Sequence, residues 1–224
     1  KNQDMKMSMM LIIQCRMCSV SAFNMATRYS RRASTLLSSS ELEVDPGMVS
    51  GLEILKYPDP RLRTVNKEVE QFDAHLKDLT RRMFNLMYEA NGVGLAAPQV
   101  GVNEQILVYN EFGDPKKWVS ECVLVNPVIV DRSEAHDIET EGCLSFPDIH
   151  GPVERSKWIK VEALNLKGRK FKKKFTGYEA RIFQHEYDHL KGVVFIDHLE
   201  DADRRDVQGE IDQLVHSFGP TGSL

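Results

Sequence analysis

Two histidines and a glutamate near residue 185 have the spacing of a metal site on a helix. The segment Gln184 to Leu190 reads Gln-His-Glu-Tyr-Asp-His-Leu. Residues four apart are separated by about one helical turn, so His185 and His189 project from the same face and their imidazoles can meet on one ion. Glu186 lies beside one of them. The pattern predicts two metal ligands and a general base, although core histidines beside surface carboxylates would give the same residues.

The flanking residues predict the helix that carries this motif. Thr176 and Glu179 have the spacing of a capping box at its start, and Gly192 is placed to end it. Apolar residues on more than one side indicate that the helix is buried. Polar groups on a buried helix need partners, and a divalent cation would supply one.

A third ligand is expected from the segment Glu141 to Pro147, which reads Glu-Gly-Cys-Leu-Ser-Phe-Pro. Cys143 lies 42 residues before His185, in a segment that must fold back over the helix. The adjacent glycine permits a close backbone approach, and Pro147 is expected to end regular strand pairing. The alternative is an inert buried thiol.

These residue types support metal-assisted hydrolysis of an amide-type bond. Three protein ligands leave a fourth position for water, whose pKa falls towards about 7 on a catalytic metal. Glu186 is placed to take the water's proton and return it to the departing amine. The Gln99 amide and the backbone N–H of Leu144 are candidate donors to the oxyanion.

Three segments in this order resemble the signature of the peptide deformylases. They are Gly-Val-Gly-Leu-Ala-Ala-Pro-Gln at residues 92–99, Glu-Gly-Cys-Leu-Ser at residues 141–145 and Gln-His-Glu-Tyr-Asp-His-Leu at residues 184–190. The first is not a dinucleotide phosphate loop, because it follows a predicted helix and does not open one after a strand. The resemblance extends from about residue 52 to about residue 199.

The resemblance implies removal of the N-formyl group from the initiator methionine of nascent polypeptides, with release of formate. A metal-bound hydroxide would attack the formyl carbon, with Glu186 as the acid/base. Fe(II) is the implied ion, and thiolate and imidazole ligands also suit Zn(II), Ni(II) or Co(II). The implied metal ligands are Cys143, His185 and His189, and the implied oxyanion donors are Gln99 and Leu144.

The resemblance also implies a substrate site. Gly94 would contribute backbone contacts to the peptide, while Val93, Tyr178 and Ile182 would line the pocket for the methionine side chain. Separately, Arg155 is expected to pair with a buried carboxylate, Glu141 or Asp188, or else to form an ordinary surface ion pair.

Two other function classes remain open at this stage. A His-Glu-x-x-His metallopeptidase shares Glu186 and both histidines, but its third ligand usually lies downstream of the helix. A non-catalytic protein that binds formyl peptides or metal would require a closed four-ligand site or the loss of the base.

Apolar periodicity predicts an α+β fold, with mainly antiparallel β-sheets packed around a central metal-binding helix. Strands are expected at 52–55, 106–109, 122–130, 158–166 and 170–175, and further helices at 73–91 and 207–218. The basic residues between 167 and 174 are expected on a solvated hairpin, with a ribosomal-RNA contact as the alternative.

The chain divides into three predicted parts: residues 1–45 as a disordered organellar presequence, 46–218 as one catalytic domain and 219–224 as a frayed tail. Residues 5–40 hold five Lys or Arg, ten Ser or Thr and no acidic residue, a presequence composition for which a secretory signal is the alternative. Formylated initiation belongs to bacteria-type ribosomes, so a presequence in front of a domain that resembles a deformylase indicates a plastid or a mitochondrion.

Charge and cysteine content narrow the classes of partner. Residues 46–224 carry 23 basic and 29 acidic side chains, a formal charge of −6, which disfavours DNA binding. The apolar run at residues 9–13 is too short to span a bilayer. Cys15 and Cys18 are interpreted as incidental, and Cys122 as core. The expected partners are the N-termini of nascent formylated polypeptides and an organellar ribosome.

Overall fold

The computed structural model describes residues 51–218. The predicted presequence, residues 1–45, and the predicted frayed tail, residues 219–224, lie outside these residues. No helix within residues 51–218 is long and apolar enough to cross a membrane.

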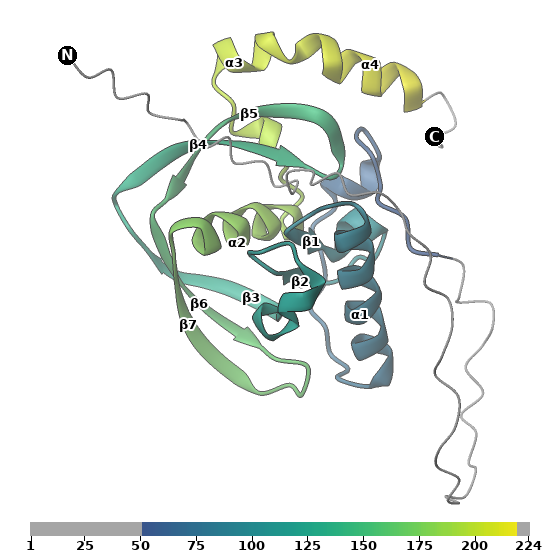
Figure 1. Ribbon diagram of the computed structural model, residues 1–224, viewed down its shortest axis with the longest axis vertical. Helices are drawn as coiled ribbons and strands as arrows, with labels where there is room; N and C mark the ends of the chain where they lie inside the picture. Colours follow the sequence, from purple (N-terminus) through teal and green to yellow (C-terminus); the bar gives the residue numbers. More distant parts are fainter. Residues whose placement is uncertain (1–50, 219–224) are drawn as a thin grey trace, which may run out of the picture. The chain divides into compact units, whose positions relative to one another are not determined.

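A five-stranded sheet forms the centre of the fold (Figure 1). Its strand order is β1-β2-β3-β6-β7, and every pair of neighbours is antiparallel. The strands are β1 (Gly94–Ala96), β2 (Ile106–Tyr109), β3 (Cys122–Arg132), β6 (Trp158–Leu164) and β7 (Lys170–Thr176). The predicted α+β class with antiparallel sheet is confirmed, and β2 has its predicted bounds.

The two long helices cover opposite faces of this sheet, α1 (Ala74–Glu89) on one and α2 (Gly177–Leu190) on the other. Strand β2 shows how the sequence places them. Leu107 and Tyr109 join the core cluster that contains the apolar side of α2, whereas Ile106 and Val108 join the cluster that contains α1. Side chains alternate between the faces of a strand, so a continuous apolar run serves both helices.

A second, two-stranded sheet was not predicted. It consists of β4 (His136–Cys143) and β5 (Phe146–Ser156), joined by a two-residue turn at residues 144 and 145. The expectation that Pro147 ends strand pairing is wrong, because Pro147 lies within β5. Each strand of this sheet has only the other as a neighbour, so a residue without an N–H is tolerated on the free edge.

The ends of α1 follow from local side-chain chemistry. Asp73 caps the helix by accepting a hydrogen bond from Leu76 N at 3.0 Å, as predicted. At the other end Asn91, and not the expected Gly92, adopts the left-handed conformation, with φ of 56°. Gly92 N then donates to Met87 O at 2.8 Å, which closes a Schellman motif.

Helix α2 starts and stops where predicted, but its predicted capping box is absent. The Thr176 side chain makes no capping hydrogen bond. Glu179 instead accepts from the Tyr109 hydroxyl and from Lys173 Nζ, both at 2.7 Å, which ties the first turn of the helix to the sheet. Gly192 adopts the left-handed conformation after the last turn, with φ of 73°.

The remaining elements are short. The segment at 52–55 is not a strand, contrary to expectation, although Leu55 N donates to Gln99 O at 2.8 Å. The predicted terminal helix is confirmed, and Ile211 is its buried contact. The short elements are the 3₁₀ turns η2 (Pro60–Arg63), η3 (Ala97–Val100), η4 (Pro115–Ser120) and η5 (Phe195–Asp197), and the helices α3 (Asp201–Asp206) and α4 (Gln208–Phe218).

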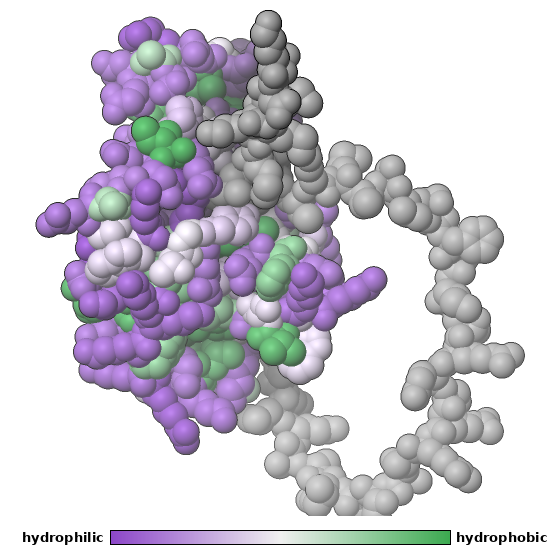
Figure 2. All heavy atoms as spheres, turned by 60° about the vertical axis from the view of Figure 1, so that its left-hand side comes forward, coloured by the Kyte–Doolittle hydropathy of each residue, from purple (hydrophilic) through white to green (hydrophobic). Residues whose placement is uncertain are grey.

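The surface of the described residues is largely hydrophilic on the face shown in Figure 2, with hydrophobic side chains in small separate groups. The predicted basic hairpin is the β6–β7 pair. Two of its lysines have acidic partners at 2.7 Å, Lys172 with Glu162 and Lys173 with Glu179. The hairpin is exposed as expected, and an RNA contact there stays a prediction.

Phe175 supplies a stability test, because its ring is 0% exposed and packs against Tyr109 and Phe183. We expect Phe175→Ala to lower the free energy of unfolding by about 3–5 kcal/mol through lost burial and a cavity. Val119→Ala, at a side chain that is 78% exposed, should change it by less than about 0.5 kcal/mol. Urea unfolding followed by circular dichroism measures both, and equal effects would contradict the assigned core.

Candidate metal centre

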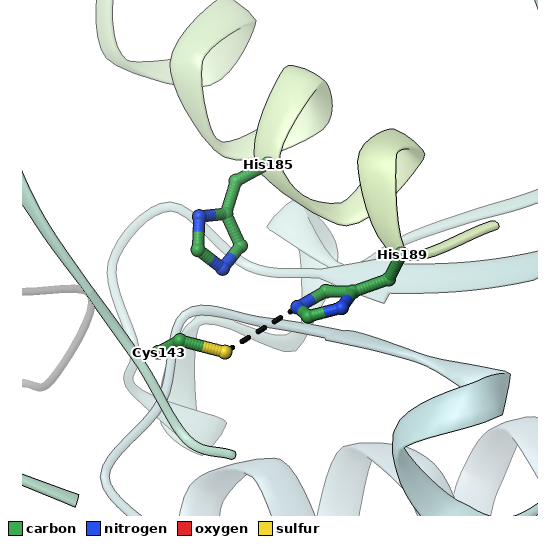
Figure 3. A group of neighbouring side chains, drawn as sticks. All are labelled: Cys143, His185 and His189. Atoms are coloured by element: carbon green, nitrogen blue, oxygen red, sulfur yellow. Dashed lines mark hydrogen bonds between the residues drawn. The ribbon is translucent and has the colours of Figure 1, made fainter. Parts of the chain in front are cut away.

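Cys143, His185 and His189 converge at one buried point (Figure 3). Cys143 ends β4, and both histidines project from α2. The ligand atoms of the three lie within 4.8 Å of one another, and Cys143 Sγ is 3.3 Å from His189 Nε2. Each residue is at most 2% exposed. One sulfur and two nitrogen donors in a buried cluster fit a divalent transition metal or zinc.

The backbone of β4 is irregular where it delivers the cysteine. Gly142 pairs with His150, but the register then shifts, and Cys143 pairs with Phe146 across the tight turn. A β-carbon on Gly142 would lie 2.6 Å from the His150 ring, so a larger residue would require this ring to move. The shift places Cys143 Sγ over α2.

Glu141 orients the first histidine. Its carboxylate is 0% exposed, and Oε2 lies 2.9 Å from His185 Nδ1. This contact leaves Nε2 of His185 for an ion. A carboxylate behind a ligating histidine fixes the ring and raises its basicity, so Glu141 is part of the site although it is no ligand.

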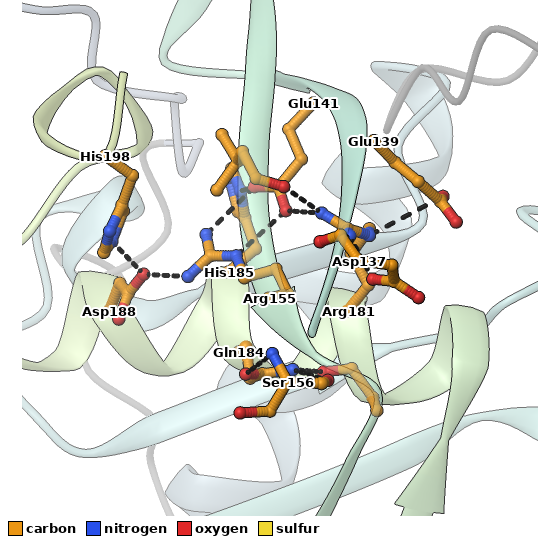
Figure 4. Close-up of polar contacts among 12 residues, drawn as sticks. Asp137, Glu139, Glu141, Arg155, Ser156, Arg181, Gln184, His185, Asp188 and His198 are labelled. Atoms are coloured by element: carbon orange, nitrogen blue, oxygen red, sulfur yellow. Dashed lines mark hydrogen bonds and ion pairs between the residues drawn. The ribbon is translucent and has the colours of Figure 1, made fainter. Parts of the chain in front are cut away.

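Two buried arginines neutralise Glu141 (Figure 4). Arg155 donates from Nε and Nη2 to the two carboxylate oxygens, both at 2.9 Å, and Arg181 donates from Nη1 to Oε1 at 2.8 Å. The sequence left open whether Arg155 pairs with Glu141 or Asp188. It pairs with both, since its Nη1 is 2.5 Å from Asp188 Oδ2.

The sequence analysis missed Arg181 and Gln184. Arg181 also reaches Asp137 Oδ1 at 2.6 Å, and Gln184 bridges the backbone of Ser156 through Oε1 and Nε2. Both side chains attach α2 to the β4–β5 sheet. The available signal was spacing: Arg181 precedes His185 by four residues, so an arginine in an apolar helix shares the metal-ligating face.

The pKa values of the ionisable groups in the site depend on one another as well as on burial. Burial alone would raise the pKa of Glu141, but the Arg155 guanidinium and the His185 hydrogen bond outweigh it and hold that pKa below its usual range. Burial opposes a charged His185, yet Cys143 and Glu141 raise its pKa. Burial, assisted by the charge on His185, lowers the pKa of His189 to about 3. His189 is therefore neutral at pH 7, as a metal ligand must be.

Glu186 is deeply buried, and the positive charges of His185 and Arg155 only partly offset the effect of that burial. It is 1% exposed, and its Oε2 has no hydrogen-bond partner among residues 51–218. Burial raises its pKa to about 7. Gly94 makes this placement possible, because a β-carbon there would lie 2.4 Å from Glu186 Oε1. A carboxyl group with a pKa near neutrality is suited to both accepting and returning a proton.

The two expected oxyanion donors both lie close to the cysteine. Gln99, on η3, donates from Nε2 to Ser145 Oγ at 3.2 Å and to Cys143 Sγ at 3.5 Å. Its Oε1 accepts from Ala96 N at 2.9 Å, which fixes the direction of the amide. Leu144 lies in the turn after Cys143. The longer contact to sulfur leaves one amide proton weakly held.

The expected methionine-pocket residues share one environment. Val93 and Ile182 are buried in the core cluster on the α2 side of the sheet, and Tyr178 packs against it. Val93 thus shares a core cluster with two residues of the metal helix itself. Their contact with a substrate stays a prediction.

Comparison with protein families gives one match over most of the chain. The model described as "Polypeptide deformylase" matches residues 51–205. Peptide deformylase 1B, chloroplastic/mitochondrial, of Arabidopsis thaliana is 41% identical over 191 residues, which is 85% of this chain and 68% of that protein. Peptide deformylase 1B, chloroplastic, of Oryza sativa subsp. japonica is 45% identical over 162 residues, or 72% of this chain and 58% of that protein.

Bacterial relatives and solved structures agree. Peptide deformylase of Neisseria gonorrhoeae is 47% identical over 148 residues, 66% of this chain and 86% of that protein. A crystal structure of plant peptide deformylase PDF1B matches with a TM-score of 0.73 and 43% identity, covering 75% of this chain and 90% of that one. Peptide deformylase from Plasmodium falciparum matches with a TM-score of 0.74 and 41% identity, covering 77% of this chain and all of that one.

The buried carboxylate behind His185 supplies a test of metal affinity. We expect Glu141→Gln to weaken Zn(II) or Co(II) binding by about 10–100-fold, because His185 loses its orienting partner and two buried arginines lose their counter-ion. Titration against a competing chelator measures the affinity. Glu154→Gln, at an exposed position on the neighbouring strand β5, is the matched control. Equal affinities in both variants would show that Glu141 does not orient the ligand.

Proposed function

This chain belongs to the polypeptide deformylase family, and we propose that it hydrolyses the N-formyl group from the initiator N-formylmethionine of nascent polypeptides, releasing formate. The observation that carries the proposal is the convergence of Cys143, His185 and His189 beside the buried, unpaired carboxylate of Glu186. Three donors with an adjacent acid/base make a catalytic site, whereas a structural site has four protein ligands.

The three donors are proposed to hold one divalent ion, with Fe(II) favoured and Zn(II), Ni(II) or Co(II) as alternatives. When bound, such an ion polarises the formyl carbonyl and makes water more acidic. Cys143 supplies an anionic thiolate and the two imidazoles supply neutral nitrogen. The carboxylate of Glu141 keeps the His185 ring in place, with Nδ1 as the hydrogen-bonded nitrogen.

Glu186 is proposed as the general acid/base. Its Oε2 accepts the proton of the attacking water, and the same oxygen returns that proton to the amine nitrogen as the C–N bond breaks. Two features support this role: no other group engages Oε2 within the described chain, and burial raises the pKa of Glu186 to about 7.

The remaining roles concern binding and the developing negative charge. Gln99 Nε2 and the backbone N–H of Leu144 are proposed to donate to the oxygen of the tetrahedral intermediate. The backbone at Gly94, which passes against Glu186, is proposed to pair with the substrate peptide. The residues proposed to surround the methionine side chain are Val93, Tyr178 and Ile182.

The other function classes fit less well. A metallopeptidase of the His-Glu-x-x-His type usually takes its third ligand from beyond the helix, whereas here the third donor is a cysteine on β4. A non-catalytic binding protein has no need for a buried carboxylate with a pKa near 7. Turnover of a formyl-Met peptide against an internal peptide bond separates these classes.

The substrate and the relatives together favour an organelle. Formylated initiation belongs to bacteria-type ribosomes, and two relatives carry the names chloroplastic and chloroplastic/mitochondrial. We therefore place the protein in a plastid or a mitochondrion, with residues 1–45 as its targeting presequence. Its partners would be nascent formylated chains and the organellar ribosome that makes them.

Replacement of the acid/base tests the mechanism directly. We expect Glu186→Gln to lower kcat for formyl-Met-Ala-Ser by about 10²–10⁴-fold, because proton transfer is lost while the ligands remain. Formate release measures the rate, and metal analysis should show one ion in both proteins. Glu154→Gln, on β5 and exposed, should keep wild-type turnover. Full activity in Glu186→Gln would exclude this glutamate as the acid/base.

Metal exchange tests the cofactor. Chelation should abolish formate release, and anaerobic Fe(II) should restore it. An iron–thiolate site loses activity in air through oxidation of iron or of Cys143. The Zn(II)- and Ni(II)-loaded proteins are the controls, since they should keep their activity during aerobic storage. An Fe(II)-loaded protein equally stable in air would count against iron.

A further inference from the structure

Three consecutive residues contact both segments that carry the proposed oxyanion donors. Leu55 N donates to Gln99 O at 2.8 Å, Lys56 Nζ donates to Leu144 O at 2.6 Å, and Tyr57 N donates to Ser145 O at 2.9 Å. The three acceptors lie far from residues 55–57 in the sequence. Residues 55–57 therefore form a strap across the Gln99 segment and the turn after Cys143.

The aromatic part of the strap is anchored in the core. Tyr57 stacks on Phe146, with ring centroids 4.7 Å apart and planes at 24°. Phe146 in turn packs edge-on against Phe195 at 5.3 Å. Phe146 is the residue that pairs with Cys143 across the turn. These contacts fix residues 55–57 to the turn that carries Cys143.

Lys56 contributes a charge as well as a hydrogen bond. Its amine is partly buried, and burial lowers its pKa, while the negative charge of Cys143 opposes that change. Because Leu144 directly follows Cys143 in the chain, the hydrogen bond to Leu144 O places the amine beside the residue that carries the sulfur. The same hydrogen bond holds the turn that presents the N–H of Leu144.

Apart from the strap, the hydrogen bonds that link the two donor segments among the described residues are those of the Gln99 side chain. Nε2 of Gln99 reaches Ser145 Oγ at 3.2 Å and Cys143 Sγ at 3.5 Å. If Gln99 Nε2 turns towards a substrate oxyanion, these contacts weaken at the moment when the geometry matters most. The contacts of residues 55–57 go to main-chain oxygens and do not change when the amide turns.

We propose that residues 55–57 hold the two oxyanion donors at their working separation, and that Lys56 is a positioning residue for formyl-group hydrolysis. This inference rests on the proposed function. Donors to an oxyanion act in the transition state and not in substrate binding, so a defect in their placement lowers kcat and leaves KM unchanged.

The test compares Lys56→Met, which keeps the length of the side chain, with Lys56→Arg, which keeps charge and donor. Lys157→Met, at an exposed lysine between β5 and β6, is the matched control. We expect Lys56→Met to lower kcat about tenfold, less than the loss of a whole oxyanion donor, with KM within about twofold. Lys56→Arg should recover most of the rate, and Lys157→Met should match wild type.

A spectroscopic measurement separates positioning from a general loss of stability. In the Co(II)-substituted proteins, the thiolate-to-cobalt absorption band should move to longer wavelength in Lys56→Met and stay in place in Lys56→Arg, because only the first loses the charge near Cys143. Thermal unfolding of all variants is recorded in parallel. A wild-type kcat in Lys56→Met would overturn the inference. So would a fall in kcat that parallels a fall in melting temperature and that Lys56→Arg does not restore.

Failure of the proposed function has a different signature. If wild-type protein with one bound metal releases no formate, deformylation is wrong for this chain. The cobalt band still reports on the strap in that case, since the contact between Lys56 and the turn does not depend on the substrate. An unchanged band in Lys56→Met would then overturn the assignment of Lys56.

Discussion

The buried carboxylate of Glu141 is the interaction on which the rest of the site depends. An unpaired buried charge is costly, and an ion pair in a protein interior is tolerated only when its geometry is good and its remaining hydrogen bonds are made. Glu141 meets both conditions, since Arg155, Arg181 and His185 occupy its oxygens. Its partners come from β5 and from two turns of α2. One carboxylate therefore couples the strand that carries the cysteine to the helix that carries the histidines.

This coupling explains why α2 lies between two sheets. Its apolar side joins the core of the five-stranded sheet through residues such as Ile182 and Phe183. Its polar side contacts the β4–β5 sheet, where Arg181 and Gln184 are satisfied. A helix buried on all sides must satisfy its polar groups within the protein. The same burial removes water from Glu186, which raises its pKa towards neutrality and suits it to proton transfer.

The site is assembled from four separate stretches of chain, and each contributes different groups. Residues 55–57 contribute contacts that hold the others, the segment around Gln99 contributes an amide, the β4–β5 turn contributes sulfur and an N–H, and α2 contributes nitrogen and a carboxylate. Close approach of backbone is needed where these stretches meet. Gly92 against Leu144, Gly94 against Glu186 and Gly142 against His150 are places where an added β-carbon would lie no more than 2.7 Å from the neighbouring side chain.

Local patterns in the sequence were sufficient for α1 and α2 and for β2, β3, β6 and β7 of the central sheet, whereas β1 was not predicted. Residues four apart on a helix, alternation along β2 and the cap at Asp73 depend on neighbours in the chain, so they can be read without a structure. Three local predictions were wrong. Pro147 lies inside a strand, the Thr176 side chain makes no capping hydrogen bond, and residues 52–55 are not a strand.

Only the tertiary structure decided the β4–β5 sheet, the second arginine on Glu141, the pKa of Glu186 and the contacts that residues 55–57 make with Gln99, Leu144 and Ser145. Each depends on contacts between residues far apart in sequence, such as Lys56 with Leu144 or Arg181 with Glu141. The burial of a group and the charges around it depend on all the residues that folding brings close to it. The sequence therefore determined which chemical groups are present, and the fold determined their charge, their orientation and what holds them.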